Sequence, residues 1–118
     1  MQITIKAAHN ELTPSAREFI EKKFSALDKF TSSGAATLAC EIEQSVAVER
    51  AGAKYRAEGN LSIDGQLYRA EATESTLEGA VDRVRDDLVR ELNRARGKKK
   101  GLMKRGGAAL KRLLRFGR

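Results

Sequence analysis

A run of basic residues near the C-terminal end of the sequence has the spacing and chemistry of a phosphate-binding surface. Its first three arginines are seven and four residues apart, which places them on one side of a helix. At about 1.5 Å of rise per helical residue, the run would form a cationic strip roughly 20 Å or more in length. Arginine suits two-pronged contact with phosphate and stacking on bases, so we predict an RNA-binding site. The residues of this run are Arg83, Arg90, Arg94, Arg96, Lys98, Lys99 and Lys100.

The same pattern also fits a solvated helix face on which arginines pair with neighbouring acids. For Arg83 and Arg85 the two interpretations stay open. From Arg94 onward we expect that no acids remain to form pairs, which favours binding of a polyanion. The acids within reach of the earlier arginines are Asp82, Asp86, Asp87 and Glu91.

Residues that commonly perform catalysis or hold metals are sparse. His9 is the sole histidine, and it has no obvious partner at catalytic or ligand spacing. Cys40 is the sole cysteine, which excludes an intramolecular disulfide and a zinc site built on several thiolates. The sequence has neither a Walker-type phosphate loop nor a dinucleotide-binding fingerprint. We therefore expect a protein that is not an enzyme, with no cofactor, no metal and no small-molecule substrate.

The charge of the chain is concentrated at one end. The 118 residues carry a net charge of +7. Residues 1–89 contain 11 basic and 15 acidic residues, whereas residues 90–118 contain 12 basic residues and one acid, Glu91. A net charge of −4 is therefore followed by one of +11. Such a block favours RNA, DNA or anionic lipid as a partner, although it also fits a tail that only aids solubility.

The first elements that position these residues are a strand and a helix. Gln2–Lys6 alternates polar and apolar residues, which predicts a short strand. Thr13 and Pro14 then suit the cap and first position of a helix. Its apolar residues recur at helical spacing, and Ser32-Ser33-Gly34 is expected to end it. That apolar stripe consists of Ala16, Ile20, Phe24 and Leu27, widened by Phe19 and Phe30.

Three further strands and a second helix are expected after this. Residues 38–43 alternate, residues 49–53 form a loop, and residues 54–63 and 66–73 pair as a hairpin turned by Asp64-Gly65. Gly59 in mid-strand indicates a bulge or a close helix contact. Ser75 or Thr76 caps the second helix, and Gly97 weakens or ends it. Its buried stripe consists of Leu77, Val81, Val84, Leu88 and Leu92.

The order β-α-β-β-β-α predicts an α+β fold. Each helix has one apolar stripe, and the strands have one apolar face. A two-layer sandwich, with a four-stranded sheet and both helices on one face, buries all of these apolar surfaces together. The first β-α-β unit is expected to be parallel and the remaining strands an antiparallel meander. We divide the chain into a domain at residues 1–96 and a basic, largely disordered tail at residues 97–118.

The basic tail, residues 97–118, leaves a second interpretation open. Residues 108–116 (AALKRLLRF) could fold as a short amphipathic helix on an anionic membrane surface. The chain shows no secretory signal and no long uncharged apolar run, so a cytoplasmic location is expected and membrane binding is not favoured. A cationic module for another RNA is the other alternative. We expect a monomer away from its target.

The sequence resembles the ribosome hibernation promoting factors, also called ribosome-associated inhibitors or sigma-54 modulation proteins, in their short form. The resemblance covers about residues 1–100 and rests chiefly on TPSAREFIEKKFSALDKF and AEATESTLEGAVDRVRDDLVRELNRARGKKK. It implies the same fold, and it implies binding to the rRNA of the small ribosomal subunit in the channel for mRNA and tRNA, without catalysis, so that translation stops while ribosomes are stored. The basic positions that match the family pattern are Arg17, Lys23, Arg90, Arg94, Arg96 and Lys98.

The sequence also departs from the family pattern. Asp87 stands where relatives often carry lysine, and Ser75-Thr76-Leu77 replaces the usual start of the second helix. The dimerisation domain of the long form is absent, so ribosome pairing by that route is not expected. Because residues 1–89 are net acidic, we expect the basic tail to replace positive charge that the domain lacks.

Overall fold

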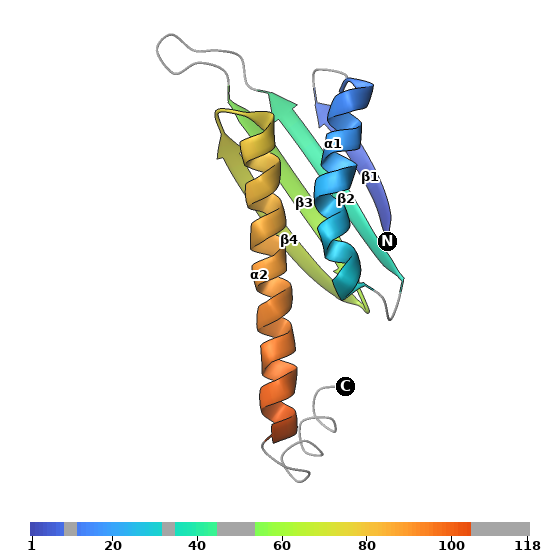
Figure 1. Ribbon diagram of the computed structural model, residues 1–118, viewed down its shortest axis with the longest axis vertical. Helices are drawn as coiled ribbons and strands as arrows, with labels where there is room; N and C mark the ends of the chain where they lie inside the picture. Colours follow the sequence, from blue (N-terminus) through green and yellow to red (C-terminus); the bar gives the residue numbers. More distant parts are fainter. Residues whose placement is uncertain (9–11, 32–34, 45–53, 105–118) are drawn as a thin grey trace.

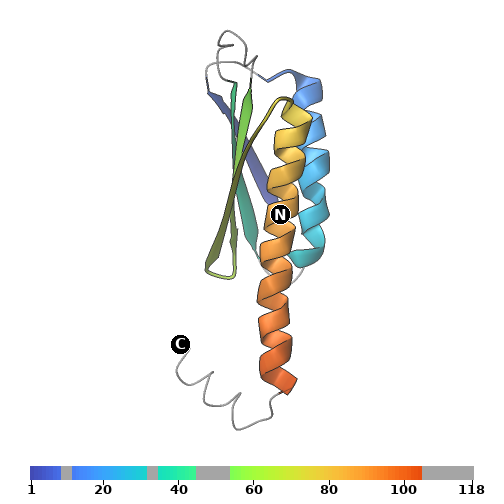
Figure 2. The ribbon, with the colours of Figure 1, turned by 90° about the vertical axis from the view of Figure 1, so that its left-hand side faces the viewer.

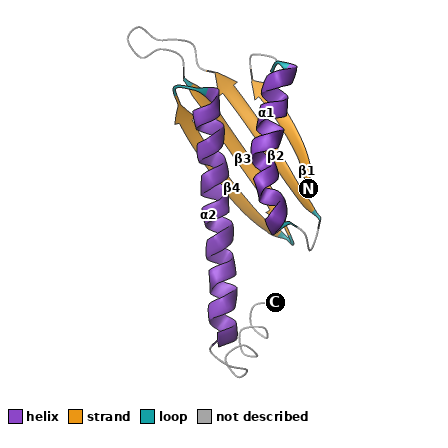
Figure 3. Ribbon diagram, viewed as in Figure 1, coloured by secondary structure: helices purple, strands orange, loops and turns teal. Residues whose placement is uncertain are grey.

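The fold is a four-stranded sheet with two helices packed on one face (Figures 1 and 2). A computed structural model describes residues 1–8, 12–31, 35–44 and 54–104, with side chains as far as Gly97. Within these ranges the predicted order and the predicted two-layer arrangement are confirmed (Figure 3). The elements are β1 (Gln2–Ala8), α1 (Pro14–Phe24), the 3-10 helix η1 (Ser25–Phe30), β2 (Ala36–Gln44), β3 (Tyr55–Ile63), β4 (Gln66–Glu74) and α2 (Leu77–Lys104).

The strands lie in their sequence order, β1-β2-β3-β4. As expected, β1 pairs with β2 in parallel, and β2, β3 and β4 form an antiparallel meander. Because side chains alternate across a sheet, β2 buries one set of residues and exposes the other. The core is largely aliphatic, and its largest fully buried side chains are Phe24, Ile20, Leu27, Leu38, Leu61, Leu88, Val81 and Val84.

A tight hairpin sets the register of β3 and β4. Asp64 and Gly65 have φ values of 50° and 78°, which is the left-handed backbone that a two-residue turn of this kind requires. The turn pairs Ile63 with Gln66, and the register continues to Tyr55 and Glu74. The hairpin predicted from Asp64-Gly65 is therefore confirmed.

The first helix begins as expected and ends differently. The hydroxyl of Thr13 accepts a hydrogen bond from the Ala16 amide at 3.1 Å, and Pro14 occupies the first turn. The α-helix ends at Phe24, however, and residues 25–30 continue as a 3-10 helix. The Ser25 hydroxyl donates to the Lys22 carbonyl at 2.6 Å, which competes with the regular ladder and marks the change. The expected stop at residues 32–34 lies outside the described residues.

The second helix is longer than the sequence indicated. Thr76 is its cap, because its hydroxyl accepts from the Gly79 amide at 3.0 Å. Gly97 does not end the helix, since α2 continues through it to Lys104; the other arm of the prediction, that Gly97 weakens the helix, stays a prediction. One glycine costs a helix only about 1 kcal/mol, and the residues around it are strong helix formers. The helix thus crosses the boundary drawn between 1–96 and 97–118, and that division stays a prediction.

The end of α2 extends beyond the sheet. Leu92 is the last buried residue among those of α2 whose side chains are described, and the end of the helix runs past the ends of the strands (Figure 1). The fold therefore presents the C-terminal end of α2 as a helix with little of the domain beside it. Residues 105–118 lie outside the described residues.

Candidate nucleic-acid interface

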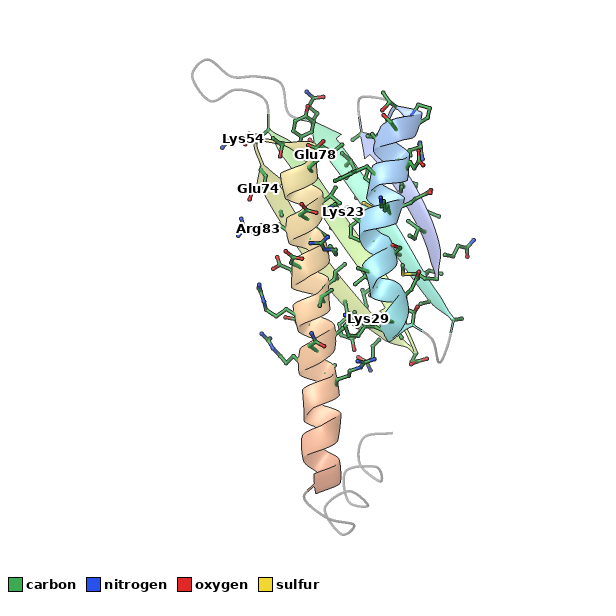
Figure 4. The ribbon with its side chains drawn as sticks, in the orientation of Figure 1. Lys23, Lys29, Lys54, Glu74, Glu78 and Arg83 are labelled. Atoms are coloured by element: carbon green, nitrogen blue, oxygen red, sulfur yellow. The ribbon has the colours of Figure 1, made fainter. Side chains whose placement is uncertain are left out.

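A row of three arginines lies along the side of α2 that faces away from α1. Arg83 lies on this side of the helix, next to Glu74 at the end of β4 (Figure 4). The spacing of seven and four residues brings Arg90 and Arg94 to the same side. Their side chains are 61%, 68% and 61% exposed, so all three guanidinium groups are open to a large partner. We call Arg83, Arg90 and Arg94 the arginine row.

Each member of the arginine row has an acidic neighbour. Arg83 lies 3.5 Å from Glu74, Arg90 lies 3.1 Å from Asp87, and Arg94 lies 3.2 Å from Glu91. Residues 94–118 contain no acid, but the inference that Arg94 therefore has no acidic partner is wrong, because Arg94 pairs with Glu91, which lies one helical turn before it. Exposed pairs of this kind contribute only about 0–1 kcal/mol, so they do not prevent these arginines from binding phosphate.

Lys23 lies between the two helices instead of beside the arginine row. Its ammonium is 3.2 Å from Asp82 of α2 and 5.4 Å from the centre of the Phe19 ring. The carboxylate of Asp82 also forms an ion pair with the guanidinium of Arg85, at 3.5 Å. Figure 4 shows Lys23 on α1, on the opposite side of α2 from Arg83. This ion pair couples α1 to α2, and it leaves Lys23 in the seam between the helices.

Arg17 is separated from the arginine row by the width of the helical layer. Its guanidinium approaches the carbonyl oxygen of Ile5 at 3.5 Å, at the β1 edge of the sheet. Because Ile5 is part of β1, the last strand on that side, Arg17 shields backbone at a sheet edge. The structure therefore does not bring Arg17 and the arginine row together.

Arg96 also lies apart from the arginine row. Its guanidinium lies 4.7 Å from the centre of the Phe30 ring and donates to the Lys29 carbonyl at 3.3 Å. It is therefore directed at η1, on the α1 side of α2. Lys98, Lys99 and Lys100 belong to α2, and their side chains lie outside the described ones. Of the sequence-predicted residues, only Arg83, Arg90 and Arg94 are seen to form one surface.

The outer face of the sheet carries a charge network that the sequence pattern did not reveal. The Arg56 guanidinium binds Glu71 with contacts of 2.8 and 2.9 Å, and Arg69 binds Glu58 and Glu71. Glu58 is on the outer face, yet its side chain is only 9% exposed because these arginines cover it. The hydrogen bond that Arg56 donates to Glu71 holds the pKa of Glu71 below its ordinary value. Register alone, which places Glu58 opposite Glu71, could have indicated this cluster.

The groups that commonly perform catalysis give little sign of a reaction site in the described part of the chain. Burial, together with Glu41 and Glu58, raises the pKa of the Cys40 thiol to about 12, so the thiolate is scarce. No cluster of histidine, cysteine and acidic residues that could hold a metal is found among the described residues. His9 lies outside them.

Hollows of modest size border the described part of the sheet, and two of them lie near β1. One, of about 150 Å³, lies between the start of α1 and the strand ends, and its lining includes Leu12, Ala16, Tyr55 and Leu77. The described residues that line this hollow include no acid, histidine, lysine or arginine. The other, of about 230 Å³, lies at the β1 end of the outer face, near Lys6. Among the described helices, none is long and apolar enough to cross a membrane.

The chain is similar to a known family over most of its length. The sequence model of the family described as "Sigma 54 modulation protein / S30EA ribosomal protein" matches residues 3–100. A curated protein of Klebsiella oxytoca named ribosome hibernation promoting factor is 28% identical over 101 residues, which are 85% of this chain and 98% of that protein.

Solved structures agree with the fold. The N-terminal domain of Thermus thermophilus Protein Y aligns with a TM-score of 0.67 and 27% identity, over 80% of this chain and 98% of that one. A ribosomal subunit interface protein from Coxiella burnetii aligns with a TM-score of 0.68 over 82% of this chain and 99% of that one. Its identity of 18% supports the fold alone.

Proposed function

Since the chain belongs to the sigma 54 modulation protein / S30EA ribosomal protein family, we propose that it binds the small ribosomal subunit through its rRNA and inhibits translation during ribosome hibernation. The family description and the names of the relatives support association with ribosomes. The finer steps, occupation of the channel for mRNA and tRNA and the resulting block of translation, are part of the proposal. They require no catalysis.

The arginine row is the observation that carries this proposal. Three exposed guanidinium groups on one side of α2 span about 16 Å of helix, which is long enough to follow several phosphates. The same helix continues to Lys104. The four charged residues of its last segment, residues 97–104, are all lysines. A rigid helix that presents cations along its length fits a structured polyanion better than a flexible peptide, because less conformational freedom is lost on binding.

The chemistry of the surface favours recognition of backbone and shape. The outer sheet face carries Arg56, Glu58, Arg69 and Glu71, and it lacks the paired aromatic residues that stack bases in sheet-type RNA-binding domains. Arginine pairs with phosphate in a planar, two-pronged way. Binding displaces counterions from the phosphates, and because this release is less favourable at high salt, the affinity falls as the salt concentration rises. The proposed contact is therefore salt-sensitive and largely independent of base sequence.

A sucrose gradient of the tagged full chain with ribosomes tests the proposal. We expect the protein to migrate with small subunits at low salt and to move toward the top of the gradient as salt increases. Protein that stays at the top under both conditions would contradict ribosome binding. Retention on anionic vesicles after nuclease treatment, together with a ribosome-free gradient, would favour the membrane alternative and count against the proposal.

Matched variants separate the arginine row from bulk charge. The double variant Arg90→Gln with Arg94→Gln should reduce migration with small subunits, because both side chains are exposed on α2. The control is Lys6→Gln with Arg69→Gln, which removes the same charge from the outer sheet face and should leave migration unchanged. Thermal melts verify that both variants fold. Equal losses in the two variants would show that net charge, not the arginine row, determines binding.

A translation assay tests the second half of the proposal. Purified protein added to a cell-free translation reaction should inhibit synthesis in proportion to its occupancy of small subunits, and the Arg90/Arg94 variant should inhibit less. Migration with small subunits without any inhibition would support binding and reject the proposed block of translation.

A further inference from the structure

Arg96 differs from every member of the arginine row in what it contacts. The arginines of the row pair with partly exposed acids, whereas Arg96 places its guanidinium 4.7 Å from the centre of the Phe30 ring. It also donates to the backbone carbonyl of Lys29, 67 residues earlier in the chain, at 3.3 Å. Figure 4 shows Lys29 at the lower end of the first helical segment, beside α2. Arg96 therefore joins two elements that are distant in sequence.

The contact supplies a hydrogen-bond donor to a backbone carbonyl at the C-terminal end of η1. The last carbonyls of a helix lack partners within the helix and carry its partial negative charge. In η1 the Asp28 carbonyl is satisfied by the amide and the hydroxyl of Thr31, both at 3.0 Å. The Lys29 carbonyl receives the Arg96 guanidinium. Arg96 thus acts as a C-terminal cap for η1 that is supplied by another helix.

Arg96 lies on α2 between the buried part of the helix and its projecting end. Within the part of α2 whose side chains are described, which ends at Gly97, Leu92 is the last buried residue, and Arg96 lies about one turn beyond it. The next residue is Gly97, a weak helix former, and from there α2 extends past the sheet to Lys104. The Phe30 contact is therefore placed where the helix leaves the domain.

We propose that Arg96 is a positioning residue that fixes the direction in which the basic end of α2, residues 97–104, leaves the domain. The inference rests on the proposed function, because that helix end is part of the surface offered to rRNA. Arg96 then contributes through the Phe30 ring and the Lys29 carbonyl, and not through a phosphate contact of its own. This replaces its predicted role within the cationic strip.

Spin-label distances in the free protein test the proposal without any ribosome. Labels on Leu67→Cys, an exposed site of β4, and Lys104→Cys, the last residue of α2, report how the helix end lies relative to the sheet. Cys40 is buried and poorly ionised, so it stays unlabelled. Arg96→Ala and Phe30→Leu should each broaden the distance distribution about twofold, because each removes one half of the same contact.

Two further variants act as controls in the same measurement. Arg94→Ala removes the same charge two residues away and should leave the distribution as in the parent, while Arg96→Lys should restore most of it because lysine keeps a cation over the ring. Unchanged distributions in Arg96→Ala and Phe30→Leu would overturn the proposal. Equal broadening in Arg94→Ala would also overturn it, because charge loss alone would then explain the effect.

Binding to purified small subunits distinguishes positioning from direct contact. Arg94→Ala should weaken binding and reduce the slope of log affinity against log salt by about one, as expected when a phosphate contact is lost. Arg96→Ala and the uncharged change Phe30→Leu should weaken binding severalfold with the parental slope. A slope reduced by about one in Arg96→Ala would overturn the proposal. If the parent does not bind small subunits, the proposed function fails, and the distance distributions still decide the role of Arg96.

Discussion

At the scale of single residues, Gly59 explains how closely α2 can approach the sheet. It pairs with Cys40 in the register of β2 and β3, directly beneath α2. A Cβ atom at this position would lie 3.0 Å from a methyl carbon of Val84 and 3.2 Å from one of Leu88. The sequence suggested either a bulge or a close helix contact at Gly59. The close contact is confirmed by these distances, and the bulge is excluded because the pairing of β3 continues through Gly59 without interruption.

Substitution of Gly59 should therefore destabilise the fold. We expect Gly59→Ala to cost about 1 kcal/mol and Gly59→Val about 3 kcal/mol, because overpacking a close-packed core forces side chains from their preferred rotamers. Urea unfolding measures the loss. Ser62→Val, which places the same side chain on the exposed face of β3, is the control and should change stability by less than about 0.5 kcal/mol. Comparable losses in both variants would contradict the close contact.

The chemistry of Cys40 gives a second prediction at this scale. Burial raises the pKa of its thiol to about 12, so almost no thiolate exists at about pH 8, where thiol reagents are commonly used. We expect a disulfide reagent to modify Cys40 only as fast as the protein unfolds. Added denaturant should accelerate the reaction in parallel with global unfolding. Rapid modification of the native protein would contradict the buried position.

At the scale of elements, the outer sheet face holds β3 and β4 together through charge. The hydrogen bond from Arg56 lowers the pKa of Glu71, and the guanidinium lies across the strand pair. A carboxyl with a depressed folded pKa adds stability above its ordinary value, here 4.5, and loses that contribution as pH falls through the folded value. The pair should therefore stabilise the hairpin at neutral pH and lose its effect in acid.

The pH dependence of Glu71→Gln checks this element. The variant should melt at a lower temperature than the parent at neutral pH, and the difference should shrink as pH falls below 4.5. Glu18→Gln, a change to an exposed glutamate of α1, is the control and should leave the shape of the curve unchanged. A difference that stays constant through the acid range would contradict a depressed pKa for Glu71.

The course of α2 through Gly97 gives a prediction that separates two helix lengths. A Cβ at Gly97 would meet no atom within 4 Å, so Gly97→Ala should stabilise this part of the helix by about 1 kcal/mol and increase helicity in circular dichroism. Gly97→Pro should remove the helical signal of the residues that follow. A helical signal left unchanged in Gly97→Pro would instead indicate that the helix already ends at this glycine.

At the scale of the whole molecule, the positive charge is concentrated along and beyond one helix. Residues 1–89 carry −4, while residues 90–118 carry +11. The sheet pairs many of its charges internally, through contacts such as Arg56 with Glu71 and Arg69 with Glu58. We therefore infer that electrostatic attraction of a polyanion comes from the end of the molecule where α2 projects.

Truncations test how this charge is divided. Deletion of residues 97–118 removes nine basic residues and the projecting end of α2, and we expect affinity for small subunits to fall by at least about tenfold. Deletion of residues 105–118 removes five basic residues and leaves α2 whole, so the loss should be smaller. Gradient sedimentation compares the two. Undiminished binding after deletion of 97–118 would reject the idea that this segment replaces charge that the domain lacks.

The sequence by itself determined the layers, the order of the elements, the starts of both helices and the β3–β4 turn. Alternation in the strands, the Thr13 and Thr76 caps and the Asp64-Gly65 turn are local signals, and each acts over a few residues. The family resemblance, now supported by the match over residues 3–100, followed from the two helical segments. The charge asymmetry could also be counted directly.

Only the tertiary structure decided which basic residues share a surface. Arg96 was predicted to lie in the cationic strip, and the family resemblance added Arg17 and Lys23 as RNA-binding residues. In the structure Arg17 contacts the β1 edge, Lys23 contacts Asp82, and Arg96 contacts Phe30. Helical spacing fixes the side of a helix on which a residue lies, but not what lies opposite it. The partner depends on how α1, η1 and the sheet pack around α2, which is set by contacts between residues far apart in the chain.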